Sequence, residues 1–310
     1  MSTLRVASYN LYLGADLTLV FGASSAEHLT RQARLAHAEL RATDFAQRAA
    51  AVARVLVRER VDVVGLQEVA RWTASSLSHG APEVRLDFLP MLLAAAEAEG
   101  ASYAGHAVNA NFEGGARVGA EESISVLGRN VVLVRRGSGV EVEVERTGGF
   151  GAAWSVPTGT SDLAVTVRRG WGWVDAALEG RPFRFVNTHL EAYDESVRAA
   201  QRDELLAAVG DPGRPVVLAG DFNAVPERVA VPAPYRDAWA VAGEPGLGHT
   251  CGQAAGLANP ESALTQRIDY VFVRDAEVTA CRVVGDRPAD RTPSGLWPSD
   301  HAGVVAELRL

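Results

Sequence analysis

Four segments of this chain combine apolar and polar positions in a pattern that predicts helices. The segment 44–60 shows it best, because Phe45, Ala49 and Val52 lie three or four residues apart and form one apolar face. Thr43 or Asp44 is suited to cap its N-terminus. We expect the other helices over residues 27–40, 86–99 and 194–209. Gly100 is suited to end the helix over 86–99.

Shorter apolar runs predict β-strands from one end of the chain to the other. In residues 140–145 valine alternates with glutamate, which suits a strand with one buried and one exposed face. The other expected strands are residues 4–9, 61–66, 131–135, 163–168, 172–178, 183–187, 215–219, 268–273, 278–284 and 303–308. Groups of strands separated by helices predict an α/β fold of two sheets packed face to face, with helices outside.

The composition indicates a globular protein with a substantial core. The chain has 310 residues, of which 47% are hydrophobic, so it could form one large domain or two ordinary ones. No apolar run reaches the roughly 18 residues of a membrane span, and the N-terminus lacks the pattern of a signal peptide. We therefore expect a cytoplasmic location. Cys251 and Cys281 favour two reduced thiols, with a single disulfide as the alternative.

The charge changes the expected partners only slightly. A formal net charge of −8 argues against tight, sequence-independent binding of duplex nucleic acid, which needs a basic surface. It does not exclude a nucleic acid substrate, because a divalent metal can supply positive charge at the scissile phosphate.

Polar side chains follow or begin many of the predicted strands. Rigid scaffolds present catalytic groups at such positions, whereas solvated residues should scatter without regard to strand ends. Each residue also has a structural explanation: Asn10 could cap a turn, Asp269 could pair with Arg267 or Arg274, and His189 could be a core histidine. As a set they predict one site, formed by Asn10, Glu68, His189, Asp221, Asn223, Asp269, Asp300 and His301.

Six motifs resemble, in order, those of the endonuclease/exonuclease/phosphatase superfamily, which contains deoxyribonuclease I. They are Ser8-Tyr9-Asn10-Leu11, Gly65-Leu66-Gln67-Glu68-Val69, Asn187-Thr188-His189-Leu190, Gly220-Asp221-Phe222-Asn223, Arg267-Ile268-Asp269-Tyr270-Val271 and Ser299-Asp300-His301. The resemblance implies a four-layer α/β/β/α sandwich and attack of water on a phosphoester, dependent on Mg²⁺ or Mn²⁺. Because the motifs span the chain, we expect a single domain over 1–310, with an insertion at about 11–43.

Hard cations prefer oxygen ligands, so Glu68 is the first candidate metal ligand, with Asn10 in support and Asp300 facing the same metal. His301, oriented by Asp269, is interpreted as a general base or as a cation that stabilises the phosphate.

The resemblance assigns roles to three further residues. It implies that Asp221 positions or deprotonates the water and that Asn223 donates to a phosphate oxygen. His189 is expected to contact another phosphate oxygen and, if protonated, to stabilise charge or protonate the leaving group. The implied reaction is in-line displacement without a covalent intermediate.

One departure concerns the partner of His189. Deoxyribonuclease I carries an acidic partner where this chain has Gly128-Arg129-Asn130, so no carboxylate can be assigned. Arg129 and Asn130 become candidates for substrate binding, the alternative being a solvated arginine. The Thr-His-Leu form also disfavours abasic-site repair.

Specificity should come from segments outside the motifs. The insertion at 11–43 begins beside the predicted metal and carries Leu17, Val20 and Phe21, which favour either a lipid or aromatic substrate or simple packing onto the body. The loops 242–260 and 285–298, with His249 and Arg291, are further candidates.

The sequence thus predicts a phosphoesterase acting on a phosphodiester or phosphomonoester, with a lipid head group, small molecule or nucleic acid as substrate. The alternatives are a metal-dependent nuclease on DNA or RNA and a non-catalytic binding protein with the same fold. No obligate protein partner is inferred.

Overall fold

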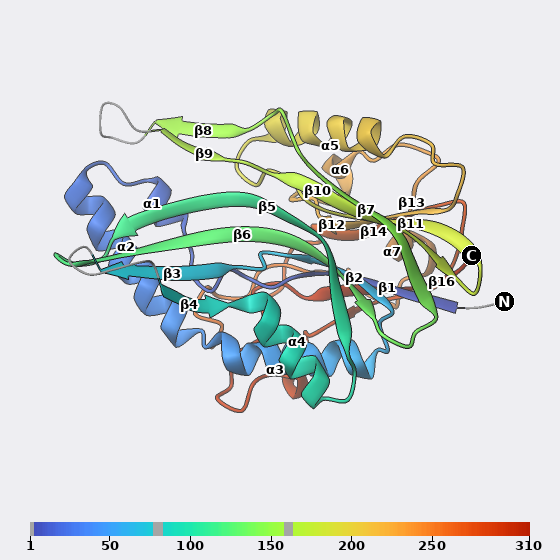
Figure 1. Ribbon diagram of the computed structural model, residues 1–310, viewed down its shortest axis with the longest axis horizontal. Coiled ribbons are helices and arrows are strands. Elements are labelled where there is room, and N and C mark those ends of the chain that lie inside the picture. Colours follow the sequence, from blue (N-terminus) through green and yellow to red (C-terminus); the bar gives the residue numbers. More distant parts are fainter. Residues whose placement is uncertain (1–2, 77–82, 158–163) are drawn as a thin grey trace.

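The computed structural model describes residues 3–76, 83–157 and 164–310 and shows two β-sheets packed face to face (Figure 1). The first sheet has the order β15 (Glu277–Val284), β16 (Gly303–Arg309), β1 (Thr3–Asn10), β2 (Val63–Gln67), β6 (Glu122–Arg135), β3 (Arg71–Ser76), β4 (Glu83–Asp87), with β5 (Tyr103–Arg117) also paired to β6. The second has the order β13 (Arg236–Asp237), β14 (Asp269–Arg274), β12 (Val216–Asp221), β11 (Arg181–His189), β10 (Gly170–Leu178), β7 (Val140–Gly149). Strands β8 (Trp154–Pro157) and β9 (Ala164–Val167) form a separate hairpin.

Helices cover the outer face of each sheet, which gives the four layers expected from the resemblance (Figure 1). Helices α2 (Ala26–Ala42), α3 (Phe45–Arg58) and α4 (Phe88–Ala98) pack on the first sheet, and α5 (Glu195–Val209) packs on the second. Short helices α1 (Thr18–Phe21), α6 (Pro226–Val229), α7 (Ala238–Ala242) and the 3₁₀ helix η1 (Pro288–Asp290) lie in the connections.

The apolar core is divided by the two-residue period of the strands. In β1, Leu4 and Val6 point between the sheets, whereas Ala7 and Tyr9 point toward the helices of the first sheet. Because β1 pairs with β16 at the other end of the chain, we propose that residues 1–310 form one domain, with an insertion at about 11–43 that contains α1 and α2.

The four predicted helices are present close to their predicted bounds. Asp87 accepts a hydrogen bond from the Leu89 backbone nitrogen at 3.2 Å, so α4 begins later than predicted. Gly100 follows α4 with φ +92°, in the left-handed region that favours glycine.

The strand predictions were least complete in the long β5–β6 hairpin, where only residues 131–135 had been expected. Strand β5 contains glycine and asparagine residues, which are uncommon in strands, and many of its side chains are exposed. Of the predicted strand 163–168, Leu163 lies outside the described residues and β9 covers the next four. Cys251 and Cys281 are both free thiols. Among the described residues, no helix is long and apolar enough to cross a membrane.

Candidate active site

Strand pairing brings the predicted polar residues to one edge of the two sheets. Strands β1 and β2 are parallel and place Asn10 opposite Gln67, directly before Glu68. Strands β11 and β12 are also parallel and place His189 opposite Asp221. Strand β14 runs antiparallel to β12, so its first residue, Asp269, lies opposite Asp221. The ends of distant segments therefore converge because of the sheet topology.

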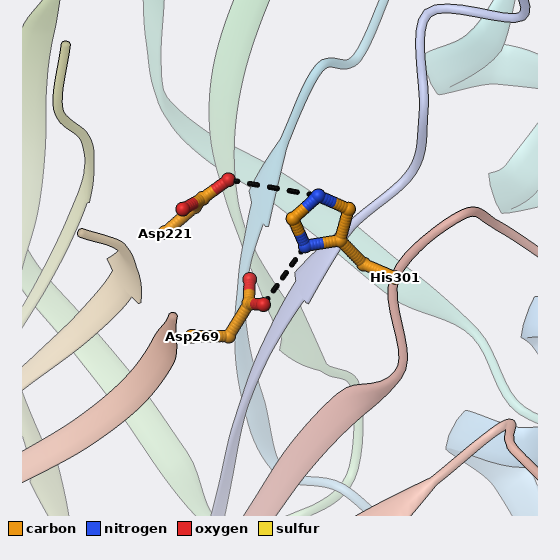
Figure 2. Close-up of side chains that lie close together, drawn as sticks. All are labelled: Asp221, Asp269 and His301. Carbon is orange, nitrogen blue, oxygen red and sulfur yellow. Dashed lines mark hydrogen bonds and ion pairs between the residues drawn. The ribbon is translucent and has the colours of Figure 1, made fainter. Parts of the chain in front are cut away.

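A buried histidine lies between two carboxylates at this edge (Figure 2). The Nδ1 atom of His301 is 2.8 Å from Oδ2 of Asp269, and its Nε2 atom is 3.9 Å from Oδ2 of Asp221. Burial by itself lowers the pKa of His301, but the charges of Asp269, Cys251 and Asp300 and the hydrogen bond to Asp269 together outweigh it and raise the pKa well above the usual value. The imidazole is therefore a cation whose orientation is fixed by Asp269.

Asp221 occupies the centre of the site and accepts hydrogen bonds from two asparagines. The Asn10 Nδ2 atom donates to its Oδ2 at 3.0 Å, and the Asn223 backbone nitrogen donates to its Oδ1 at 2.9 Å. Burial, with the neighbouring charge of Asp269, raises the pKa of Asp221 to about 7. A carboxylate that binds a proton near neutral pH is suited to act as a general base.

His189 has an arginine as its partner. Its Nε2 atom is 3.5 Å from Oδ2 of Asp221, and its Nδ1 atom is 3.2 Å from Nη1 of Arg169. Since arginine can only donate, Nδ1 must accept, and the ring proton lies on Nε2. Burial and the charge of Arg169 lower the pKa of His189 well below its usual value. Of the roles considered for His189, those that need a protonated ring are therefore disfavoured, and the neutral imidazole offers one N–H.

Arg169 is a residue that the sequence analysis missed. It comes directly before β10, and its Nε atom is 3.9 Å from the carboxylate of Glu191, which is fully buried. Its position before a strand was the same signal that identified the other residues, but no motif marked it.

Glu68 and Asp300 face an open cleft with a volume of about 350 Å³, which is also lined by His189 and Arg169. Glu68 has φ +55°, an unfavourable conformation for a residue with a side chain, and its Oε2 accepts from the Leu13 backbone nitrogen at 2.7 Å. Burial raises the pKa of Asp300 to about 6; the negative charge of Glu68 adds to this rise, and His301 opposes it. Two carboxylates that repel each other across a cleft fit a divalent cation.

A second group of potential metal ligands consists of Asp221, Asp269 and His301, whose ligand atoms lie within 4.8 Å of one another. In this group Nδ1 of His301 is already hydrogen-bonded to Asp269. Because Mg²⁺ prefers oxygen ligands, the Glu68 and Asp300 pair is the better candidate.

The two asparagines hold the site together in different ways. Oδ1 of Asn10 accepts a hydrogen bond from the Tyr12 backbone nitrogen at 3.0 Å, and its amide nitrogen donates to Asp221. Because the oxygen that would bind a metal already has this partner, the clearer role of Asn10 is to position Asp221. Asn223 has φ +48°, and its Nδ2 donates to the Leu190 carbonyl at 3.0 Å. One N–H of Asn223 remains for a substrate oxygen.

Arg129 and Asn130, the expected substrate contacts, have partners within the protein. Arg129 donates to the carbonyls of Val69 and Ala70 and pairs with Asp87 at 2.5 Å, so it braces the loop after Glu68. Asn130 is 1% exposed and donates to the Gly170 carbonyl. In the part of the chain that the structure describes, neither residue lines the cleft.

The loop candidates His249 and Arg291 also lie apart from the cleft. His249 lines a different cavity, beside Trp239 and Leu247. Arg291 packs over Trp297, with 5.2 Å between its guanidinium carbon and the ring centroid. We assign neither a substrate contact.

Comparison with known proteins finds a matching family and a set of solved structures with a similar fold. The model of the endonuclease/exonuclease/phosphatase family matches residues 7–301. An endonuclease/exonuclease/phosphatase from Bacteroides vulgatus is 18% identical, with each chain covered over 100% of its length and a TM-score of 0.61. A mannosyl-6-phosphatase from Bacteroides thetaiotaomicron is 19% identical over 99% of this chain and 100% of that one, with a TM-score of 0.62. TDP2 from D. rerio, complexed with a single-strand DNA product, is 17% identical over 100% of both chains, with a TM-score of 0.60. These identities show a shared fold alone. No curated protein matches the chain.

Proposed function

This chain belongs to the endonuclease/exonuclease/phosphatase family, and from that premise we propose that it is a divalent-metal-dependent phosphoesterase that uses direct in-line attack of water. Members of the superfamily are phosphoester hydrolases. The observation that carries the proposal is the position of Asp221, which lies between His189 and His301 beside the cleft that Glu68 and Asp300 line.

Each group has a role that follows from its protonation. Glu68 and Asp300 would hold Mg²⁺ or Mn²⁺, which supplies positive charge to the phosphate when bound. Asp221 accepts a proton from the attacking water, since its pKa of about 7 suits a base at neutral pH. His301 is better suited to the cationic role than to that of the base, because its pKa is raised.

The remaining donors surround the position of the phosphate. His189 offers its Nε2–H and Asn223 an amide N–H, so both can hydrogen-bond to phosphate oxygens as negative charge develops. Asp269 acts through His301 by fixing the orientation of the ring.

A nuclease acting on DNA or RNA is the second candidate, because TDP2 with its single-strand DNA product has the same fold. The net charge of −8 favours a smaller phosphoester over a long duplex. Hydrolysis of plasmid and single-stranded DNA, compared with phosphodiesters and phosphomonoesters of small molecules and lipids, separates these candidates.

Metal dependence is tested by Glu68→Gln together with chelation. We expect EDTA to abolish hydrolysis of bis-p-nitrophenyl phosphate and added Mg²⁺ or Mn²⁺ to restore it. Glu68→Gln should lower kcat/KM at fixed metal concentration by about a hundredfold, because a neutral amide oxygen binds a divalent cation more weakly than a carboxylate does. Glu121→Gln, an exposed control, should behave like the wild type. A broad phosphoester panel without metal-dependent turnover would favour a binding protein instead.

Arg169 is proposed as a positioning residue that sets the tautomer of His189. In Arg169→Met the Nδ1 atom loses its donor, so we expect the pKa of His189 to rise and its ring proton to redistribute between the nitrogens. The kcat/KM value should fall on the order of tenfold to a hundredfold. Nuclear magnetic resonance of the ring nitrogens measures the tautomer directly.

Two variants serve as controls for this prediction. Arg168→Met changes the adjacent, exposed arginine and should alter neither measurement. Arg169→Lys retains a donor and should recover part of the activity. A wild-type spectrum with the proton on Nδ1 would refute the assignment.

A further inference from the structure

A second cavity, of about 360 Å³, adjoins the polar cleft and has largely apolar walls. Both cavities are lined by Leu17, Phe21 and Phe112, so the apolar cavity begins where the polar cleft ends. We call it the apolar pocket. Its other walls come from helices α1 and α2 and from strands β5 and β6; they include Val20, Leu29 and Val126.

Small residues create the space inside the apolar pocket. Ala33 and Ala36 lie one turn apart on α2 and are 3% and 5% exposed, and Gly114 and Ala116 face the pocket from β5. Larger side chains at these positions would fill the space with protein. The side chains of Leu17 and Leu29 instead remain partly exposed. A ligand that covered this apolar surface would gain binding free energy from its burial.

Aromatic rings mark the junction of the two cavities. The ring of Phe21 lies 5.9 Å from that of Phe112 and 6.0 Å from that of Tyr193, which lines the polar cleft. A molecule that passes from the cleft to the apolar pocket would therefore run between aromatic side chains.

The chemistry of the walls argues against a sugar or a nucleotide in this position. Apart from Glu113, the described lining residues of the apolar pocket carry no charged side chain. Hydroxyl and phosphate groups would lose water without gaining enough partners, and Glu113 would repel a second phosphate. An aliphatic chain has no polar groups, so it loses no hydrogen bonds with water when it enters the apolar pocket.

Building on the hydrolase proposed above, we propose that the substrate is a phosphoester with an aliphatic chain, whose phosphate binds beside Glu68 and His189 and whose chain occupies the apolar pocket. The pocket then supplies affinity through burial of methylene groups. The side chains at the polar cleft carry out the hydrolysis. This division assigns the insertion at 11–43, which forms much of the pocket wall, the role of selecting the substrate.

The test is a titration of the whole protein with methyl-, butyl- and octylphosphonate in the presence of Mg²⁺, measured by calorimetry. We expect affinity to increase about threefold to fourfold for each added methylene until the pocket is filled. Ala116→Phe, which fills the pocket from β5, should reduce the ratio of octyl to methyl affinity by at least about tenfold. The second variant, Leu29→Asn on α2, should reduce the same ratio by making the wall polar, without filling the pocket.

Ala104→Phe is the matched control, because Ala104 lies on β5 with similar exposure but outside both cavities. It should preserve the wild-type ratio. Affinity that does not depend on chain length, or a ratio unchanged in both pocket variants, would overturn the proposal.

The outcome is separable from that of the proposed hydrolase. If methyl p-nitrophenyl phosphate is hydrolysed but chain length has no effect on binding, only the apolar pocket proposal fails. If chain length raises affinity but no phosphoester is hydrolysed, the pocket binds the chain and the hydrolase proposal fails.

Discussion

Replacing Asp221 by asparagine is expected to lower kcat about a thousandfold, since the variant retains the shape of the side chain but loses the base. The single amide oxygen can keep the hydrogen bond from the Asn223 backbone nitrogen or the one from the Asn10 side chain, so we expect the variant to fold with a modest loss of stability. Steady-state kinetics on the best small phosphoester measures the loss, and a thermal unfolding curve checks the fold. The KM value should change much less than kcat, because Asp221 acts on the water.

The pH profile gives an independent readout. The base must be ionised, so wild-type activity should be present above the pKa of Asp221 and be lost as the pH falls through it. That pKa is about 7 before a cation binds, and a cation favours the ionised form, so the acid limb should lie at or below this pH. Asp203→Asn, an exposed change on α5, should keep both kcat and the acid limb. Full activity in Asp221→Asn would transfer the role of base to another group.

The positions of the central residues could be predicted because they depend on strand ends. Asn10 and Glu68 follow adjacent parallel strands, as do His189 and Asp221 in the other sheet. A sequence that shows where an apolar strand stops therefore also shows which side chain stands at the edge of the sheet. Pairing of β1 with β2 and of β11 with β12 then brings these ends together.

The roles of the two arginines near the site could not be predicted from the sequence. Arg129 and Arg169 both lie near strands, but one braces the loop after Glu68 and the other contacts His189. Their partners are 60 and 20 residues away, so the role of each depends on tertiary contacts. An arginine is long and flexible enough that its neighbours along the chain do not determine where its guanidinium lies.

The apolar pocket could not be predicted from the sequence, although the sequence analysis had singled out three of its lining residues. Leu17, Val20 and Phe21 were consistent with packing or with substrate binding, and the structure shows that they contact the core and also line the pocket. Periodicity identifies an apolar face but does not show whether small residues opposite, such as Ala33, leave space beside it.

The insertion and the loop with Asp300 depend on one buried arginine. Arg48 of α3 is 0% exposed and donates to the carbonyls of Leu11 at 2.7 Å, Thr43 at 2.8 Å and Pro298 at 3.1 Å. Its guanidinium also packs over the ring of Phe45 at 4.9 Å. The side chain thus ties both ends of the insertion to the segment before Asp300. Burial lowers its pKa to about 10, so it remains a cation at neutral pH.

Arg48→Met is therefore expected to lower the free energy of unfolding by about 3 kcal/mol or more, because three buried carbonyls lose their donor. Denaturant unfolding measures this loss. Arg54→Met, on the same helix but partly exposed and 3.9 Å from Glu99, should cost less than about 1 kcal/mol. Equal losses in the two variants would show that Arg48 has no special role.

A second effect of Arg48→Met should appear at the metal site. Because Pro298 lies two residues before Asp300, loss of the anchor should let that carboxylate move relative to Glu68. The folded variant should then need a higher Mg²⁺ concentration for half-maximal activity, whereas Arg54→Met should not. An unchanged Mg²⁺ requirement in the folded variant would mean that the Asp300 loop is held in place without Arg48, and that the role of this arginine is confined to stability.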